Sequence, residues 1–180
     1  MRQLPNLLTG SRIAVIPLMV PVFYLPGDWG HWLSAGLFAY ASITDFFDGY
    51  LARAWGVQSK LGRFLDPIAD KLLVAAAILL LVHADRAHLI PSLAILAREI
   101  LVSGLREYLA ELRVSVPVSQ LAKVKTGFQM SAIFLLLLGA GGPSWLYADI
   151  LGQIALWLAA GLTLVTGYAY LRTGLRYMDD

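Results

Sequence analysis

Six runs of mainly apolar residues alternate with short polar, glycine- or proline-containing connections along the 180 residues of the chain. A helix that crosses a bilayer needs about 20 predominantly apolar residues. The runs lie at residues 11–26, 32–54, 66–83, 88–110, 121–139 and 148–171. This pattern predicts an all-α polytopic membrane protein with six transmembrane helices, folded as a single integral-membrane domain over residues 1–180.

The connections carry residues that break helices, at 26–28, 55–57 and 139–143. Ahead of the first run, residues 2–9 combine a proline and an asparagine with leucines, which predicts a short segment lying along the membrane interface. The last run contains small residues that favour close helix contacts, within or between subunits: Gly152, Gly161 and Gly167.

The composition supports a membrane location. Hydrophobic residues make up 58% of the chain and charged residues only 14%, whereas a soluble domain carries about a quarter charged residues. Cysteine is absent, which excludes disulfides, thiolate metal sites and cysteine nucleophiles. The net charge of +2 is modest, so nothing indicates a nucleic-acid partner.

Basic residues gather on one side of the predicted membrane. Cytoplasmic loops are enriched in lysine and arginine, and the residues on this side are Arg2, Arg12, Arg53, Lys60, Arg63, Lys71, Arg113, Lys123, Lys125, Arg172 and Arg176. The other three connections hold only Arg86. We therefore expect both termini and the connection between the second and third runs to lie in the cytoplasm.

Four of the 12 acidic residues, Asp45, Asp48, Asp66 and Asp70, lie around the connection between the second and third runs. Asp66 followed by Pro67 is also a favourable helix start. Residues three or four apart share a helix face, so the four carboxylates can converge near the cytoplasmic ends of two antiparallel helices. Carboxylates without nearby histidine or cysteine suit Mg²⁺ or Mn²⁺, and two such ions can assist phosphoryl displacement.

Small residues and an arginine accompany the aspartates. Gly49 and Ala52 leave room against the helix, and Arg53 can bind a phosphate through two hydrogen bonds. We interpret the stretch as a site for a metal-bound pyrophosphate compound. A structural alternative is that Arg53 and Lys71 pair with individual aspartates, and that Gly49, Ala52 and Gly62 serve close helix packing.

The pattern D-x-x-D-G-x-x-A-R, eight residues, G-x-x-x-D-x-x-x-D runs from Asp45 to Asp70 and resembles the signature of the CDP-alcohol phosphatidyltransferases at every position. The resemblance implies a six-helix membrane fold, usually a homodimer, that transfers a phosphatidyl group from CDP-diacylglycerol to an alcohol and releases CMP. It also implies that the four aspartates hold the metal ions and that Asp70 is the base for the acceptor hydroxyl. The residues it assigns to the cytidine diphosphate pocket are Gly49, Ala52, Arg53 and Gly62.

Shorter motifs outside the signature resemble a bacterial branch of this family, the phosphatidylglycerophosphate synthases. They are PNLLT at 5–9, REI at 98–100, LRE at 105–107 and KVKT at 123–126, with Gln129 one turn later. This resemblance implies glycerol 3-phosphate as the acceptor and the bacterial inner membrane as the location. Serine, inositol phosphate and phosphatidylglycerol stay open as alternative acceptors.

Glycerol 3-phosphate is a dianion, so its capture beside four carboxylates requires fixed positive charge. The candidates are Arg98, Arg106, Arg113, Lys123 and Lys125. The positive-inside rule would also place basic residues in these loops, and Arg98 can instead pair with its neighbour Glu99. His83 and His88 fall on the opposite side of the membrane, where we expect solvated loop residues.

We expect CDP-diacylglycerol to enter from the inner leaflet and the terminal hydroxyl of glycerol 3-phosphate to attack its phosphorus directly, although a covalent intermediate at Asp70 stays open. A cation transporter is the alternative from a different class. Transporters bind their cargo near the bilayer midplane between matching halves, whereas these carboxylates cluster near one surface beside Arg53. A purely structural protein would leave the four carboxylates unexplained.

Overall fold

The structure, a computed structural model, describes residues 4–55, 60–112, 114 and 119–175, and side chains within 10–45, 65–112, 114 and 119–175. Its long helices are α1 (Leu4–Phe23), α2 (Asp28–Trp55), α3 (Lys60–His83), α4 (Leu89–Glu111), α5 (Gln120–Leu138) and α6 (Ala148–Leu175). Two single-turn 3₁₀ helices, η1 (Gly139–Gly141) and η2 (Ser144–Leu146), connect α5 to α6. The described residues contain no strand, which confirms the all-α prediction.

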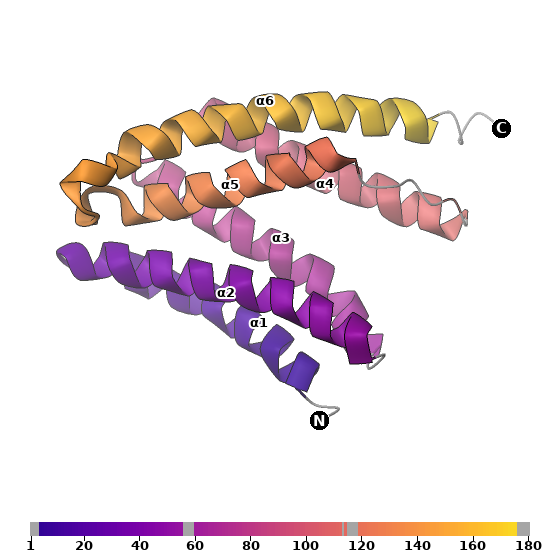
Figure 1. The fold of residues 1–180 in the computed structure, drawn as a ribbon, viewed down its shortest axis with the longest axis horizontal. Coiled ribbons are helices and arrows are strands. Elements are labelled where there is room, and N and C mark those ends of the chain that lie inside the picture. The colour runs from indigo at the N-terminus through magenta and orange to yellow at the C-terminus, as the bar shows by residue number, and fades with distance from the viewer. Residues whose placement is uncertain (1–3, 56–59, 113, 115–118, 176–180) are drawn as a thin grey trace.

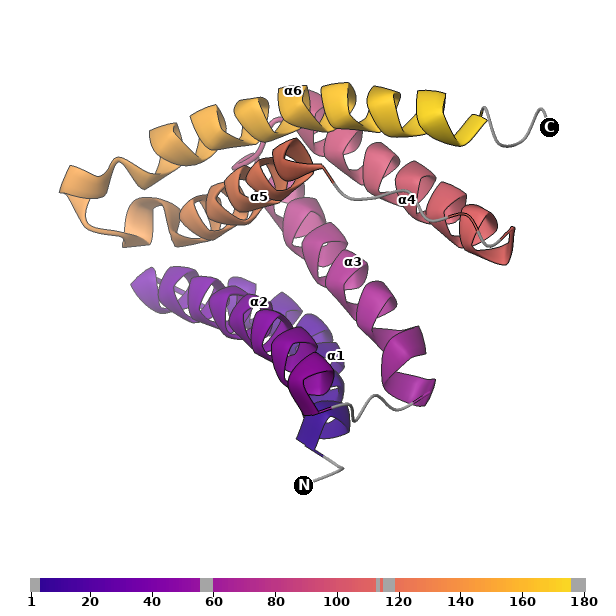
Figure 2. The same ribbon diagram turned by 45° about the vertical axis from the view of Figure 1, so that its right-hand side comes forward.

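The helices form two packed groups that separate toward one end. α1 packs on α2 and α3, while α6 packs on α5 and α4 (Figure 1). Toward the end where α2 stops and α3 starts, these helices splay away from α4 and α5 (Figure 2). The beginning of α1 and the end of α6 lie at the same end of the molecule. This shared end agrees with the predicted topology, whereas its side of the membrane stays a prediction.

The helix boundaries leave one expectation untested and correct another. α1 runs without interruption from Leu4, so no boundary separates residues 4–9 from the first helix, and their position along the membrane interface stays a prediction. Pro5 does not break the helix because a first-turn proline lacks only an N–H that would be unpaired anyway. α3 starts at Lys60, so Pro67 lies inside it and the preceding aspartate is not its cap. Residues 60–65 continue the apolar helical spacing, which extends the helix.

Two described segments are long and apolar enough to cross a membrane, Gln120–Gly141 and Ser144–Leu175. The apolar part of α1, Gly10–Phe23, is shorter. α3 and α4 carry charged residues within their length, such as Asp70 and Glu99, which interrupt their apolar sequence. The structure therefore contains a helix for each of the six predicted spans, and two of these helices are long and apolar enough to cross a membrane.

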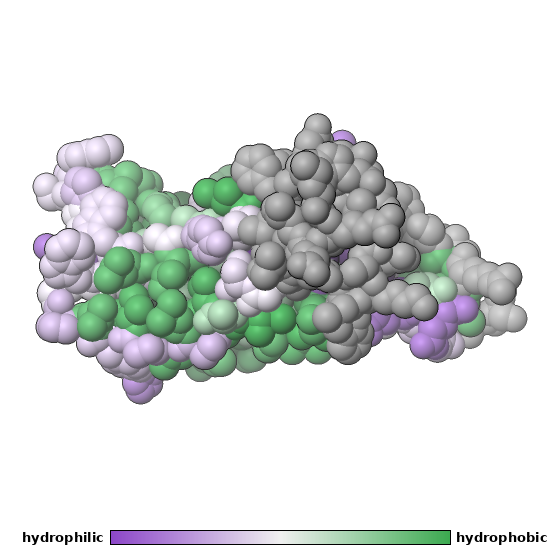
Figure 3. Space-filling model, turned by 90° about the horizontal axis from the view of Figure 1, so that it is seen from below, coloured by the Kyte–Doolittle hydropathy of each residue, from purple (hydrophilic) through white to green (hydrophobic). Residues whose placement is uncertain are grey.

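Large apolar side chains also cover the outside of the molecule. Leu79 of α3 is 62% exposed and Ile100 of α4 is 69% exposed. Figure 3 shows a broad group of apolar side chains on the left half of one face, bordered by more hydrophilic residues at the left end. Soluble monomers rarely expose contiguous apolar surface on this scale, so contact with lipid explains this surface.

The buried core joins the two helix groups. Met19 of α1, Phe38 of α2, Leu81 of α3, Ile133 of α5 and Leu156 of α6 are each at most 1% exposed and belong to one cluster. Lipid tails are as apolar as these side chains, so packing contacts between the helices stabilise this cluster within a membrane. The core therefore holds the two helix groups together, although they separate toward the end where α2 stops and α3 starts.

Glycines in α6 allow close contacts within the chain. A Cβ atom at Gly152 would lie 2.8 Å from the side chain of Leu136, and one at Gly167 would lie 2.9 Å from the side chain of Arg98. Gly161 has open space around it. Two of the three predicted contact glycines therefore serve packing inside the subunit.

Candidate functional site

A cavity of about 860 Å³ lies between α2, α3, α4 and α5. Its polar lining residues are Ser42, Asp45, Asp70, Lys71, Glu99, Lys125, Thr126 and Gln129. Its apolar lining residues are Ile43, Leu72, Val74, Ala75, Leu96, Ile100 and Met130. The cavity thus combines acidic and basic groups with an extensive apolar wall, as an amphipathic phosphate ester requires.

Two of the predicted metal ligands meet at a buried arginine of α1. Arg12 Nη1 donates to Asp45 Oδ1 in α2, and Nη2 donates to Asp66 Oδ1 in α3 at 3.2 Å. The Arg12 side chain is 2% exposed, whereas the side chains of Asp45 and Asp66 are 39% and 44% exposed. The two carboxylates therefore converge on one cation and keep part of their surface accessible.

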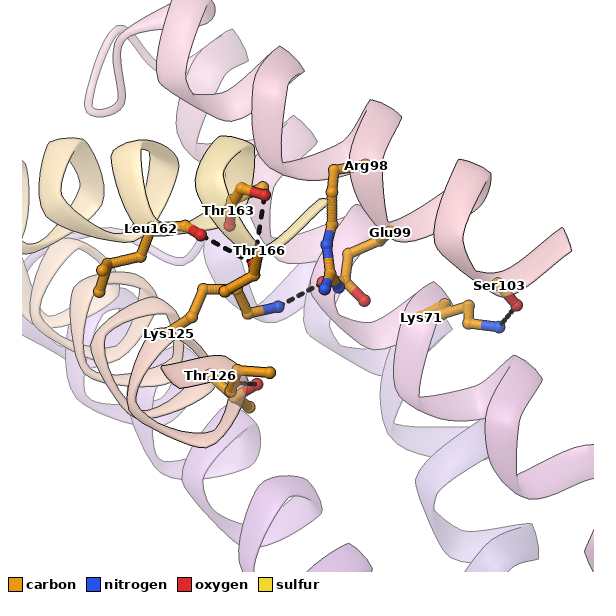
Figure 4. A network of polar contacts seen from close by, with 10 residues as sticks. Lys71, Arg98, Glu99, Ser103, Lys125, Thr126, Leu162, Thr163 and Thr166 are labelled. Atoms are coloured by element: carbon orange, nitrogen blue, oxygen red, sulfur yellow. Dashed lines mark hydrogen bonds and ion pairs between the residues drawn. The ribbon is translucent and has the colours of Figure 1, made fainter. Parts of the chain in front are cut away.

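Asp70 lies one turn after Asp66 in α3, is exposed, and lines the cavity together with Asp45. The next residue, Lys71, also lines the cavity and donates to Ser103 Oγ in α4. Figure 4 shows this contact between the two helices. A carboxylate and an ammonium group from the same turn of α3 therefore border the cavity.

Several predicted residues fall outside what the structure describes. Asp48, Gly49, Ala52, Arg53 and Gly62 lie in helices whose backbone is described, but the positions of their side chains are not. Arg113 lies outside the described residues altogether. Among the described side chains, no group of three or more histidine, cysteine, aspartate or glutamate residues could hold a metal ion. What the described part provides is the pair of carboxylates at Arg12, together with Asp70 and Glu99 in the cavity that Asp45 also lines.

A second polar cluster joins α4 to α5 (Figure 4). Lys125 Nζ donates to Glu99 Oε1 at 2.5 Å, and Arg98 Nη1 donates to the same oxygen at 3.1 Å. Lys125 is 3% exposed, and both Lys125 and Glu99 line the cavity. A buried lysine needs a counter-charge, and Glu99 provides it here. The structure thus brings one predicted acceptor-binding residue into the cavity.

The other predicted acceptor-binding residues with described side chains point elsewhere. The guanidinium of Arg106 lies 5.8 Å from the ring centroid of Tyr170 in α6. Arg98 packs against α6 at Gly167, and Lys123 is exposed. None of these cations lines the cavity, so their roles stay predictions. The cation that the sequence reasoning missed in the cavity is Lys71.

The histidines at the opposite end lie among aromatic residues. The ring centroid of His83 is 6.3 Å from that of Tyr24, and His88 is 6.3 Å from Trp157. Neither histidine lines the cavity.

Arg12, Glu99 and Gln129 are further residues that the sequence reasoning did not assign to the site. Arg12 carried a signal, since an arginine in an apolar helix requires a charged partner. Gln129 carried a weaker signal, because it lies one turn after the KVKT motif at 123–126.

Comparison with known proteins places the chain among enzymes of lipid synthesis. The family model described as CDP-alcohol phosphatidyltransferase matches residues 2–165. A Rickettsia felis protein is 52% identical over 176 residues, which make up 98% of this chain and 97% of that protein. A Pectobacterium atrosepticum protein is 45% identical, with 94% of this chain and 93% of that protein covered.

Both relatives are named CDP-diacylglycerol–glycerol-3-phosphate 3-phosphatidyltransferase. A Pseudomonas fluorescens protein of the same name is 42% identical over 94% of this chain and 89% of its own length. The resemblance drawn from the residues at 45–70 is thereby confirmed, and the chain belongs to the CDP-alcohol phosphatidyltransferase family.

Proposed function

We propose that the chain transfers the phosphatidyl group of CDP-diacylglycerol to glycerol 3-phosphate, giving phosphatidylglycerophosphate and CMP for phospholipid biosynthesis. Relatives named for this reaction align with nearly the whole chain. The observation that carries the proposal is the cavity in which Asp45 and Asp70 face the same space as Lys125, beside an apolar wall.

The two substrates use different parts of this cavity. The acyl chains of CDP-diacylglycerol extend along the apolar wall toward lipid, at residues such as Ile43, Leu72 and Met130. The cytidine diphosphate group binds to the signature residues Gly49, Ala52, Arg53 and Gly62. Lys125 is the described cation best placed for the acceptor phosphate, and we retain Arg98, Arg106, Arg113 and Lys123 as further candidates.

The carboxylates suit a divalent metal site. Asp45 and Asp66 already converge on the cationic group of Arg12, and both keep accessible surface. Oxygen donors of this kind select Mg²⁺ or Mn²⁺, and the residues that would hold two ions are Asp45, Asp48, Asp66 and Asp70. When bound, such ions neutralise the pyrophosphate and the departing CMP.

The chain's own residues position the acceptor and move one proton. Asp70 accepts the proton of the terminal hydroxyl of glycerol 3-phosphate. The resulting oxygen forms a bond to the phosphorus that carries the diacylglycerol group, and the bond from this phosphorus to the oxygen of CMP breaks. Lys125 holds the acceptor phosphate by charge-assisted hydrogen bonds. One displacement therefore yields both products.

We propose the bacterial inner membrane as the location, with six spans, both termini and the cavity on the cytoplasmic side, and a homodimer as the assembly. The two apolar helices and the bacterial relatives support a membrane protein. The start of α1 and the end of α6 lie at the open end of the helix groups, which supports the topology (Figure 2).

The test is CMP release by the purified protein in detergent, with CDP-diacylglycerol and either Mg²⁺ or Mn²⁺. Glycerol 3-phosphate is compared with serine, inositol phosphate and phosphatidylglycerol, each with and without a chelator. We expect release that requires both the metal and glycerol 3-phosphate. Release with another acceptor would keep the reaction class and overturn the acceptor, whereas no release from folded protein would overturn the function.

A further inference from the structure

One buried polar side chain of the cavity is left without a hydrogen bond. Gln129 of α5 is 3% exposed, and its Oε1 has no hydrogen-bond partner among the described residues. Gln129 also lines the cavity that contains Asp45 and Asp70. A buried carbonyl oxygen usually has a partner, because leaving it unpaired is unfavourable. No described residue therefore supplies the hydrogen bond that this oxygen lacks, and Gln129 borders a cavity whose occupant could supply it.

This combination sets Gln129 apart from other buried polar groups. Further buried side-chain oxygens without a partner in the described part of the chain belong to Ser34, Ser92, Gln153 and Thr163. None of those residues lines the cavity. Of these buried residues with an unpaired side-chain oxygen, only Gln129 lines the cavity proposed for the substrates.

The position of Gln129 also fits a small phosphorylated acceptor. It follows Lys125 by one helical turn, and residues four apart on a helix have Cβ atoms about 5–6 Å apart on the same face. Both side chains are 3% exposed and line the cavity. A cation and a hydrogen-bond acceptor therefore succeed one another along α5, at a spacing that suits the phosphate and a hydroxyl of one three-carbon molecule.

The hydrogen-bond donors of glycerol 3-phosphate identify the partner of this oxygen. The dianion has only two donors, its C1 and C2 hydroxyl groups, and the C1 proton passes to Asp70 in the proposed reaction. We propose that Gln129 Oε1 accepts a hydrogen bond from the C2 hydroxyl and thereby selects acceptors that carry a donor at C2. The inference rests on the proposed function, because it takes glycerol 3-phosphate as the acceptor.

The experiment compares glycerol 3-phosphate with 3-hydroxypropyl phosphate, which keeps the phosphate and the terminal hydroxyl but lacks the C2 hydroxyl. CMP release gives kcat/KM for each acceptor at saturating CDP-diacylglycerol. We expect the wild-type protein to prefer glycerol 3-phosphate by roughly 10- to 100-fold, because a site built for a hydroxyl discriminates against an analogue without it. Equal kcat/KM values in the wild type would overturn the proposal without any variant.

Gln129→Met removes the acceptor oxygen and keeps a side chain of similar length. We expect it to lower kcat/KM for glycerol 3-phosphate and to reduce the preference to within about threefold, while 3-hydroxypropyl phosphate is little affected. Gln153→Met is the matched control, because Gln153 has an unpaired Oε1 in the described structure but does not line the cavity. The control should keep the wild-type preference. An equal loss for both acceptors in Gln129→Met would show a general structural role and overturn the proposal.

Folding of each variant is judged by its elution from a size-exclusion column in detergent. If Gln129→Met does not fold, Gln129→Asn replaces it, since this variant keeps the amide but withdraws it by one methylene group. The same collapse of preference is expected there, and a retained preference would count against the inference. Failure of the proposed function is seen separately, as absence of CMP release by the wild-type protein with glycerol 3-phosphate.

Discussion

The guanidinium of Arg12 donates a hydrogen bond to Asp66 at 3.2 Å, although the two residues are 54 positions apart. The same group binds Asp45, so one cation of α1 joins the carboxylates of α2 and α3. Since the Arg12 side chain is only 2% exposed, its charge depends on these partners. Arg12 therefore holds two predicted metal ligands from different helices near one another.

Replacing Arg12 by alanine should destabilise the protein, because Asp45 and Asp66 would remain close together without their cation. A loss of about 2 kcal/mol is expected for hydrogen bonds to charged groups. In a chain of this length, that corresponds to a decrease in Tm of about 4–8 °C. Thermal unfolding in detergent measures it. Arg172→Ala serves as the control, because Arg172 is exposed in α6. Equal Tm values for Arg12→Ala and wild type would contradict a stabilising role.

Asp70→Asn should remove the proposed base and preserve the shape of the side chain. We expect CMP release to fall by about 10²- to 10⁴-fold, the usual contribution of general acid–base catalysis, with little change in Tm. Asp28→Asn is the control, because Asp28 is exposed at the start of α2 and does not line the cavity. Ordinary activity in Asp70→Asn would remove Asp70 from the role of base.

Lys125 and Lys123 offer a matched pair for testing the acceptor site. Lys125 is buried and lines the cavity, whereas Lys123 is exposed and does not. Lys125→Met should raise KM for glycerol 3-phosphate by about tenfold or more, because it removes a charge-assisted hydrogen bond. KM for CDP-diacylglycerol should change little. Lys123→Met should raise KM for glycerol 3-phosphate less than Lys125→Met does, because Lys123 does not line the cavity.

Equal effects of the two lysine substitutions would show that the phosphate is attracted by the general charge of this end of α5. An effect of Lys125→Met confined to CDP-diacylglycerol would instead move this lysine to the nucleotide site. Initial-rate measurements of CMP release, with each substrate varied in turn, separate these outcomes.

The sequence predicts the bounds of two helices closely. α4 and α5 begin and end within one residue of the predicted ranges 88–110 and 121–139. The start of α3 is six residues earlier than predicted, because Asp66-Pro67 resembles a helix start while Lys60 already begins the helix. Local sequence signals cannot distinguish a proline in the first turn from one that the surrounding helix tolerates.

The site is less predictable, because its contacts depend on how helices rotate against each other. The signature places Asp45 and Asp70 together without reference to packing, and both line the cavity. Whether a basic residue faces the cavity depends on tertiary structure, and Arg106 turns to Tyr170 of α6 instead. The partner of Asp45 comes from α1, and no spacing along the chain links the two.

Arg86 lies in the turn between α3 and α4 and holds the end of α5. Its Nη2 donates to the carbonyl oxygen of Leu136 and, at 3.0 Å, to that of Leu137. Its guanidinium lies 5.8 Å from the ring centroid of Phe23. Burial lowers the pKa of Arg86, and the charge of Asp149 opposes this effect. The residue that looked like an exception to the basic-residue rule is thus a structural cap.

Arg86→Met should lower stability without affecting catalysis. The last carbonyl groups of α5 would lose their donor, and unsatisfied buried carbonyls cost about 1–3 kcal/mol, or a decrease in Tm of about 2–12 °C. Since Arg86 is absent from the cavity lining, kcat/KM measured below the transition should stay within about twofold of wild type. A large loss of activity at unchanged Tm would contradict the assignment of Arg86 to stability rather than to catalysis.

Gly139→Ala tests the same cap from the other side. Gly139 has φ of +43°, and a Cβ there would lie 1.9 Å from Arg86 Nη2 and 3.0 Å from Asp149 Oδ1. The substitution should therefore displace the guanidinium and add backbone strain. In the Arg86→Met background part of this cost is already absent, so the two Tm decreases should be less than additive. Additive decreases would show that Gly139 is required only for its backbone conformation.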